Sequence, residues 1–256
     1  MGKGEEAMKR PFLWVTLLSA LTVMLAALGV LCGAIYGQAT DAALYGEKSR
    51  QAVADALGTR EEADITAYIG LDAAQQAEAA SAIALYMAHG GEGERLGLPI
   101  LGEREIAHMA DVRGLIALCG NVRAVCISLA GALAVAIAWI GAGIGRHRAA
   151  LLGALAGLLA LAALAFATFL MLNTAGFADL FVRMHEVVFT NDLWLLNPKT
   201  DILIRMMPQG LFERALADVA VQAAGALAVA LSLLCAVYVV VSGMIRRHLA
   251  QEVSAT

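Results

Sequence analysis

Charged residues are scarce in this chain of 256 residues. Only 16% of them are Asp, Glu, Lys or Arg and 60% are hydrophobic, whereas a soluble domain is about a quarter charged. The mean hydropathy is +0.73. This composition excludes a disordered chain, a coiled coil and an ordinary cytosolic enzyme. The net charge of −4 gives no basic balance, so no nucleic-acid partner is predicted.

Cysteine is also scarce, and its spacing carries no motif. The four cysteines form neither a CxxC pair nor a Cys/His pattern, which argues against a disulfide framework and a zinc site. The sequence also lacks an HExxH pair, a glycine-rich phosphate loop and a GxSxG elbow. We therefore predict no metal and no cofactor. Cys119 is explained more simply as a small apolar filler than as a thiol nucleophile.

Four stretches contain no Asp, Glu, Lys or Arg and are rich in Leu, Ala, Val and Gly. They cover 11–40, 124–145, 149–178 and 219–245, and each exceeds the roughly 20 residues that a helix needs to cross the hydrocarbon core. Backbone groups cannot stay unpaired in lipid, so these stretches are predicted to be helices. The first is longer than the apolar region of about 7–15 residues in a signal peptide, so we interpret it as a retained span.

Lysine and arginine are concentrated beside these stretches. Seven of them occupy short flanks, at positions 3, 9, 10, 146, 148, 246 and 247, and such flanks stay in the cytoplasm. The predicted fold class is an all-α integral membrane protein with four transmembrane helices and a mainly helical extracytoplasmic cap. In chain order, the predicted segments are a cytoplasmic N-terminus (1–10), the first span (11–40), the first part of the cap (41–122), the second span (123–145), a cytoplasmic turn (146–148), the third span (149–173), the second part of the cap (174–218), the fourth span (219–245) and a cytoplasmic tail (246–256).

The predicted cap shows helix signals and no alternating strand pattern. Residues 59–62, Thr-Arg-Glu-Glu, are typical of a capping box that starts a helix ending near Ile69. Asp72 is predicted to start a second helix, which ends before Gly90 and Gly91. After a turn-rich connector at 92–102, a further helix is predicted to run toward the second span.

Two histidines stand out because each lies near a predicted span and has distinctive neighbours. His108 has Glu105 and Asp111 three residues to either side, where a helix would let a carboxylate hydrogen-bond the imidazole and fix its tautomer. His185 lies in an aromatic stripe, in which residues at helical spacing are Phe177, Phe181, His185 and Phe189. An ionisable group at a membrane surface is costly unless it is paired or functional. The simpler interpretation of the first group is a solvated polar face.

The segment after this stripe, residues 191–201, is polar, turn-rich and carries Trp194, as expected of a loop that folds onto a site. The chain resembles the lipoprotein intramolecular transacylases of Gram-positive bacteria, the Lit family, over nearly its whole length. The residues that carry the resemblance are Arg104, Glu105, Ile106, His108, Met109, Asp111 and Val112, then Phe181, His185, Phe189, Asn191 and Trp194, and finally Asp201, Leu203, Ile204, Pro208 and Phe212.

The resemblance implies an acyl transfer at the outer face of a bacterial cell membrane. The substrate would be the N-terminal cysteine of a diacylglyceryl-modified lipoprotein, held among membrane lipids, and its sn-2 acyl chain would move to the α-amino group to give the lyso form. His108 and His185 would be the catalytic pair. Glu105, Asp111, Arg104, Asn191 and Asp201 would support them, with Arg104 and Asn191 as candidate oxyanion donors. The predicted pocket lining is Phe177, Phe181, Phe189, Trp194 and Phe212.

A competing interpretation is a non-catalytic membrane protein, such as a receptor or assembly factor, with a binding cap. The two interpretations differ in whether His108 and His185 lie next to each other. A small transporter is a third possibility, but it would require polar residues deep in the spans, which show almost none.

Overall fold

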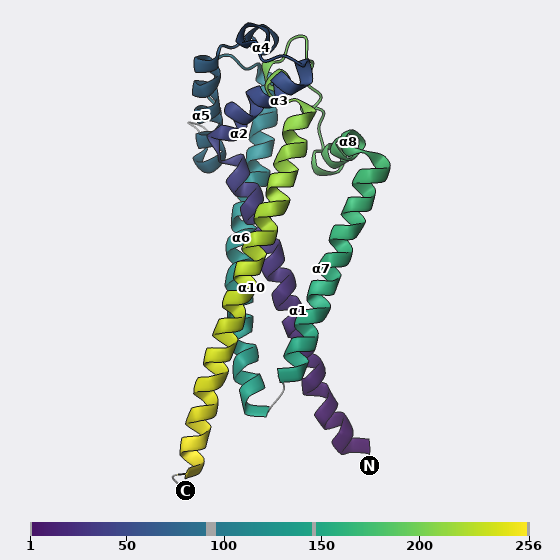
Figure 1. Cartoon of the computed structure of the whole chain (residues 1–256), viewed down its shortest axis with the longest axis vertical. Helices are drawn as coiled ribbons and strands as arrows, with labels where there is room; N and C mark the ends of the chain where they lie inside the picture. The colour runs from purple at the N-terminus through teal and green to yellow at the C-terminus, as the bar shows by residue number, and fades with distance from the viewer. Residues whose placement is uncertain (1, 91–95, 145–146, 255–256) are drawn as a thin grey trace. The chain divides into compact units, whose positions relative to one another are not determined.

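The computed structural model describes residues 2–90, 96–144 and 147–254, and this part of the chain is helical with no strand (Figure 1). Four of its helices are long and apolar enough to cross a membrane. The predicted all-α membrane fold is therefore confirmed. The helices are α1 (Gly2–Ala39), α2 (Ala42–Tyr45), α3 (Glu47–Leu57), α4 (Glu62–Ile69), α5 (Ala73–His89), α6 (Glu103–Ile144), α7 (His147–Ala175), α8 (Phe177–Val188), α9 (Ile202–Met206) and α10 (Gln209–Ser254).

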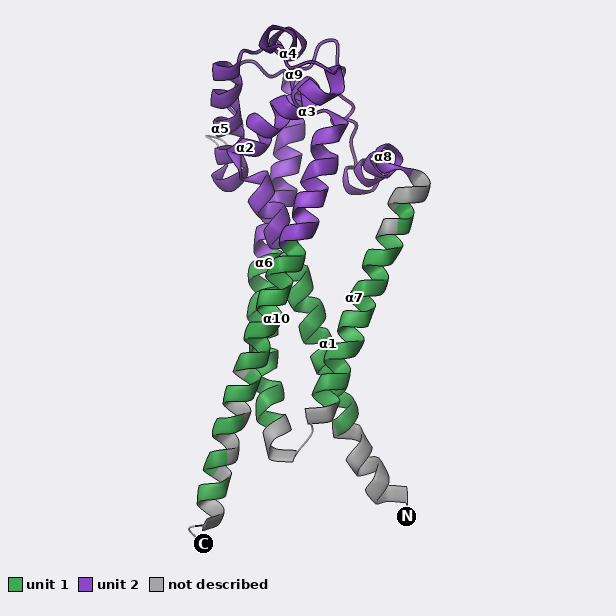
Figure 2. Ribbon diagram, viewed as in Figure 1, with its two compact units in different colours: residues 1–32, 122–171, 223–256 green, residues 33–121, 172–222 purple. Residues whose placement is uncertain are grey.

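The chain divides into two compact units (Figure 2). Unit 1 comprises residues 1–32, 122–171 and 223–256, and thus most of the apolar length of the long helices. In this unit α7 approaches α1 closely through glycine: a Cβ at Gly153 would lie 2.0 Å from the carbonyl oxygen of Thr16, and one at Gly157 would lie 3.0 Å from Val23. Small residues permit such backbone approach, which is how helices associate in lipid.

Unit 2 comprises residues 33–121 and 172–222, and therefore the short helices together with the adjoining ends of α1, α6 and α10. Its apolar core includes fully buried side chains from α3, α4, α5 and α9. They include Val53, Ile69, Ile83, Met87 and Met206. Burial of such side chains contributes about 1.5–3 kcal/mol each to folding, so this unit has a core of its own.

The start of α5 confirms the prediction made at Asp72. Its carboxylate accepts a hydrogen bond from the backbone N–H of Gln75, whose side-chain oxygen accepts one from the N–H of Asp72. The helix ends at His89, with Gly90 at φ 81°. A positive φ favours glycine because it has no Cβ. Gly91 and residues 92–95 of the connector lie outside the described residues.

The capping box predicted at residues 59–62 is wrong. α4 begins at Glu62, and its N-cap is Glu61, whose side chain forms no capping hydrogen bond. Thr59 instead belongs to the end of α3, where Gly58 is left-handed and the N–H of Thr59 donates to Ala54. This hydrogen bond satisfies an end carbonyl of α3, and the hydroxyl of Thr59 accepts from the N–H of Glu61 and not from that of Glu62, as a capping box would require.

α6 runs without a break from Glu103 to Ile144. The helix predicted after Gly102 and the second predicted span are therefore one helix. α7 begins at His147, and positions 145–146, which include part of the predicted turn, lie outside the described residues. The sidedness of the segments stays a prediction.

Candidate functional site

Unit 2 brings His108 of α6 and His185 of α8 together. Their ring centroids are 6.1 Å apart, and the side chains are 8% and 7% exposed. The ring of Phe189, directly after α8, lies 5.4 Å from His108 and 5.5 Å from His185. Two imidazoles from distant parts of the sequence therefore share one aromatic neighbour and are both shielded from water.

The tautomer of His185 follows from its own helix. Its Nδ1 lies 2.7 Å from the carbonyl oxygen of Phe181, one turn earlier. A carbonyl oxygen only accepts hydrogen bonds, so Nδ1 carries the hydrogen. In the neutral ring, Nε2 then holds the lone pair and is the nitrogen able to accept a proton.

His108 is buried with an unsatisfied nitrogen. Among the described residues, its Nδ1 is the buried side-chain nitrogen or oxygen that has no hydrogen-bond partner. His108 precedes the uncharged stretch of α6 that begins at residue 124, which is the part predicted to cross the membrane. Burial lowers the pKa of His108 from 6.5 to about 4, with a further decrease from His185 and an opposing increase from Asp111. The ring is therefore neutral at pH 7.

The hydrogen bonds of Glu105 go to backbone groups and not to His108, the predicted partner. The carboxylate of Glu105 is 3% exposed and accepts hydrogen bonds from the backbone N–H groups of Gly102, at 2.7 Å, and Leu203, at 2.6 Å. A buried carboxylate requires such donors. Glu105 thus joins the start of α6 to the start of α9, and it supports the site by fixing the helix that carries His108.

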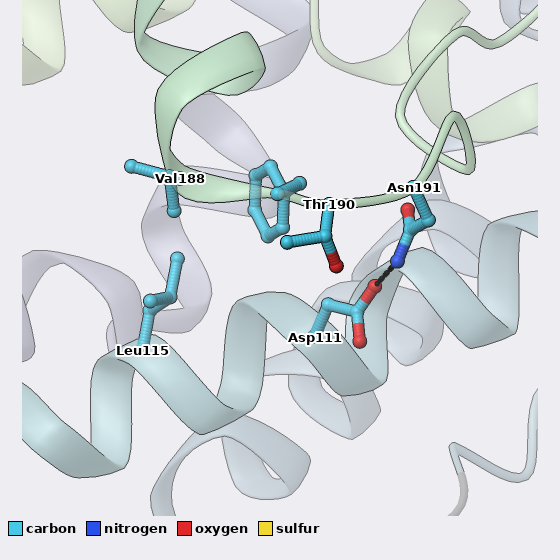
Figure 3. Close-up of a pocket in the computed structure, with 6 residues that line it drawn as sticks. Asp111, Leu115, Val188, Thr190 and Asn191 are labelled. Atoms are coloured by element: carbon cyan, nitrogen blue, oxygen red, sulfur yellow. Dashed lines mark hydrogen bonds between the residues drawn. The ribbon is translucent and has the colours of Figure 1, made fainter.

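Asp111 and Arg104 attach the loop at residues 190–196 to α6. Asp111 accepts a hydrogen bond of 2.9 Å from the side-chain amide of Asn191 (Figure 3). Arg104 donates to the carbonyl oxygen of Asp192 and lies 3.3 Å from its carboxylate. Positions 104, 108 and 111 share one helix face, so the two attachments lie on either side of His108. Asp111 therefore influences His108 through its charge and not through the predicted hydrogen bond.

These attachments also change the interpretation of the candidate oxyanion donors. The guanidinium of Arg104 donates to Asp192, and the side-chain amide of Asn191 donates to Asp111. Both residues therefore position the loop. The indole N–H of Trp194 donates to the carbonyl of Asn191 at 3.1 Å. Asp201 closes a turn, accepting from the N–H of Asn197 and the hydroxyl of Thr200.

The predicted aromatic residues form one connected cluster around His185. Phe181 lies 4.3 Å and Trp194 5.0 Å from the His185 ring, measured between centroids. Phe181 also contacts Phe177 at 5.7 Å and Phe212 at 4.9 Å. Aromatic pairs at these separations attract one another beyond simple burial. The cluster gives His185 an apolar, largely anhydrous surrounding.

An open pocket adjoins the cluster between α6 and the end of α8 (Figure 3). Its lining residues are Asp111, Leu115, Val188, Phe189, Thr190 and Asn191. Sequence reasoning missed Leu115, Val188 and Thr190. Leu115 had a usable signal, since it lies seven residues after His108 and thus on the same helix face. In the described residues, no three His, Cys, Asp or Glu side chains converge as metal ligands.

The fold and the site together define an α-helical, multi-pass membrane protein with a buried pair of histidines. The family model of the lipoprotein intramolecular transacylase Lit matches residues 58–212, which is more than half of the chain. The chain therefore belongs to the Lit family.

Solved structures of similar fold come from Bacillus cereus. The membrane-integral lipoprotein intramolecular transacylase Lit of that organism has a TM-score of 0.63 and 18% identity, over 88% of this chain and 95% of that one. A variant with one histidine replaced by arginine has a TM-score of 0.60 and 20% identity, over 93% and 96% of the two chains. A search of curated proteins finds no match.

Proposed function

We propose that this protein is a lipoprotein intramolecular transacylase. It moves the sn-2 acyl chain of an S-diacylglyceryl cysteine to the α-amino group of the same cysteine, which leaves a lyso-form lipoprotein. Membership of the Lit family supports the class of reaction. The observation that carries the proposal is the pair of buried imidazoles 6.1 Å apart. Their adjacency favours an enzyme over a non-catalytic receptor or assembly factor.

His185 is the base in this proposal. Its Nδ1 donates to Phe181, so Nε2 is available to take a proton from the attacking amine. A reference histidine pKa of about 6.5 suits proton transfer near neutral pH. As the amine nitrogen bonds to the ester carbonyl carbon, one of its protons passes to His185.

His108 delivers the proton to the leaving oxygen. A neutral imidazole can accept a proton on one nitrogen while it releases one from the other, and no described residue hydrogen-bonds the Nδ1 of His108. The bond between the carbonyl carbon and the sn-2 oxygen breaks, and the oxygen receives the proton passed on from His185. One proton leaves nitrogen and one arrives on oxygen, so the reaction is an isomerisation that consumes no water.

The aromatic cluster serves two needs of this reaction. The intermediate is an eight-membered ring of N, Cα, Cβ, S, two glyceryl carbons, the ester oxygen and the carbonyl carbon, which closes poorly in a flexible chain. Holding its two ends together therefore supplies much of the rate. Phe181, Phe189 and Trp194 around the histidines also exclude water, which would otherwise hydrolyse the ester.

The proposed site faces the outside of the cell, with both termini in the cytoplasm. The Lys and Arg of the short flanks support this topology. Single cysteines at Gly91 and Lys199, placed in a cysteine-free background, should react with an impermeant thiol reagent added outside the cell. Reaction of both sites only after the cytoplasmic side is opened would reverse the topology.

The reaction is tested by mass spectrometry of a lipoprotein N-terminus in a host that lacks other N-acylating enzymes. Because the mass does not change, fragmentation must place the acyl chain on nitrogen. His108→Ala and His185→Ala should each lose about 10²–10⁴-fold in rate while still inserting in the membrane. The double variant should lose less than the product of the single losses. An unmodified amine after expression of folded wild-type protein would overturn the proposal.

A further inference from the structure

α8 carries three different stripes of side chains along its twelve residues. The first stripe is the aromatic and histidine face that packs inward, namely Phe177, Phe181 and His185. The second is charged, and comprises Asp179, Arg183 and Glu186. The third, which we call the aliphatic stripe, comprises Leu180, Met184 and Val187. Residues at these spacings share a helix face.

Two of the three residues of the aliphatic stripe are exposed although they are apolar. Val187 is 85% exposed and Met184 is 43% exposed, whereas His185 between them is 7% exposed. Nothing in the described part of unit 2 thus covers Val187. Successive residues of a helix are rotated by about 100°. The aliphatic stripe therefore lies about a quarter turn around α8 from the aromatic and histidine face. The charged stripe lies nearly opposite that face. An amphipathic helix of this kind has a side suited to lipid.

The position of α8 in the chain identifies what covers the stripe. α7 ends at Ala175, and only Gly176, at φ 79°, separates it from Phe177. The uncharged stretch that contains α7 continues to residue 178. Since one residue spans about 3.8 Å, α8 must begin where a membrane-spanning helix leaves the hydrocarbon. Lipid is therefore the apolar surrounding that lies nearest in the chain to the aliphatic stripe.

We propose that α8 lies in the plane of the membrane, with the aliphatic stripe embedded among lipid acyl chains and the charged stripe facing water. The helix then sets the depth of His185. A helix with side chains is about 10–12 Å across, so His185 lies close to the boundary between headgroups and hydrocarbon. The glyceryl esters of lipids occupy this depth. This last step rests on the proposed function, because it identifies why the histidine is placed there.

The depth of α8 in the bilayer can be measured at two neighbouring positions, one in the aliphatic stripe and one in the charged stripe. In a cysteine-free background, Val187→Cys and Glu186→Cys are each labelled with an environment-sensitive fluorophore, and the full chain is reconstituted in phosphatidylcholine–phosphatidylglycerol vesicles. Brominated acyl chains should quench the label at 187, and aqueous iodide should quench the label at 186. Equal quenching of both labels by iodide, with no effect of brominated lipid, would overturn the in-plane placement.

Activity gives a second test. In vesicles, Val187→Asp should reduce the transacylation rate about fivefold or more, because a charge on the embedded face weakens the binding of an amphipathic helix to lipid. Val182→Asp is the control, since Val182 is 42% exposed but lies away from the aliphatic stripe. Equal rates for the two variants would contradict the proposal. If wild-type protein shows no transacylation, the proposed function fails, while the quenching data still decide the placement of α8.

Discussion

The two units differ in how far their polar side chains reach. In unit 1, hydroxyl groups donate to the carbonyl four residues earlier in the same helix, as Thr16, Ser19, Thr22, Thr168 and Ser232 do. In unit 2, polar side chains join different elements, as Lys48 does with Asp218, at 2.7 Å, and Glu105 with Leu203. Unit 1 thus presents apolar helix surfaces with their polar groups satisfied locally. Unit 2 can hold loops and histidines in fixed positions, so the candidate chemistry lies there.

The comparison predicts that close packing dominates the stability of unit 1. Gly153→Ala should destabilise the protein by about 2 kcal/mol or more, because the new Cβ would lie 2.0 Å from the backbone oxygen of Thr16. Gly131→Ala, where a Cβ meets nothing within 4 Å, should be neutral or slightly stabilising. Thermal unfolding in detergent measures both. Similar melting temperatures for the two variants would show that α1 and α7 do not pack in this way.

In unit 2, we expect the largest loss of stability when a buried hydrogen-bonding side chain is changed, whereas in unit 1 it comes from an added methyl group. Glu105→Gln should cost about 1–3 kcal/mol, because one amide end would present N–H to a backbone N–H that now meets a carboxylate oxygen. The exposed Glu78 provides the control variant Glu78→Gln, which should change stability little. Unfolding monitored by thiol accessibility in unit 2 measures both. A melting temperature unchanged by Glu105→Gln would refute the assigned role.

The attachments on either side of His108 should affect rate more than stability. Arg104→Ala removes an exposed contact, which is worth at most about 1 kcal/mol, yet it releases the loop over His108 and should slow the reaction about tenfold. Asp111→Asn should slow it less than His108→Ala does, since Asp111 only raises the pKa of His108 and holds Asn191. If His108→Ala kept more activity than Asp111→Asn, these roles would be reversed.

A pH dependence of stability is also expected. Burial lowers the pKa of His108 from 6.5 to about 4 in the folded protein, so the unfolded chain takes up a proton first as the pH falls. The contribution of neutral His108 is complete above pH 6.5 and is lost progressively toward pH 4. Wild-type protein should therefore lose more of its melting temperature between pH 7.5 and 5 than His108→Gln. Identical losses would mean that His108 is not desolvated.

The spans were predictable from the sequence because a long apolar run without charged residues is most stable as a helix in the hydrocarbon core of a membrane. The start of α5 was predictable because Asp72 and Gln75 satisfy each other within four residues. The role of Glu105 was not, since its partners are backbone N–H groups that every sequence has. The proximity of His108 and His185 depends on tertiary packing. Their spacing alone did not predict it, and the resemblance to a family only implied it.

The contact between Trp194 and His185 has an optical consequence. Their rings lie 5.0 Å apart, so the indole is in direct contact with the imidazole. The chain has three tryptophans, so replacing Trp14 and Trp139 by phenylalanine leaves one emitter beside the proposed base. Its intensity should depend on this ring contact, and His185→Ala should change it. The protein thus contains its own fluorescent reporter of the surroundings of that histidine, readable before any lipoprotein is added.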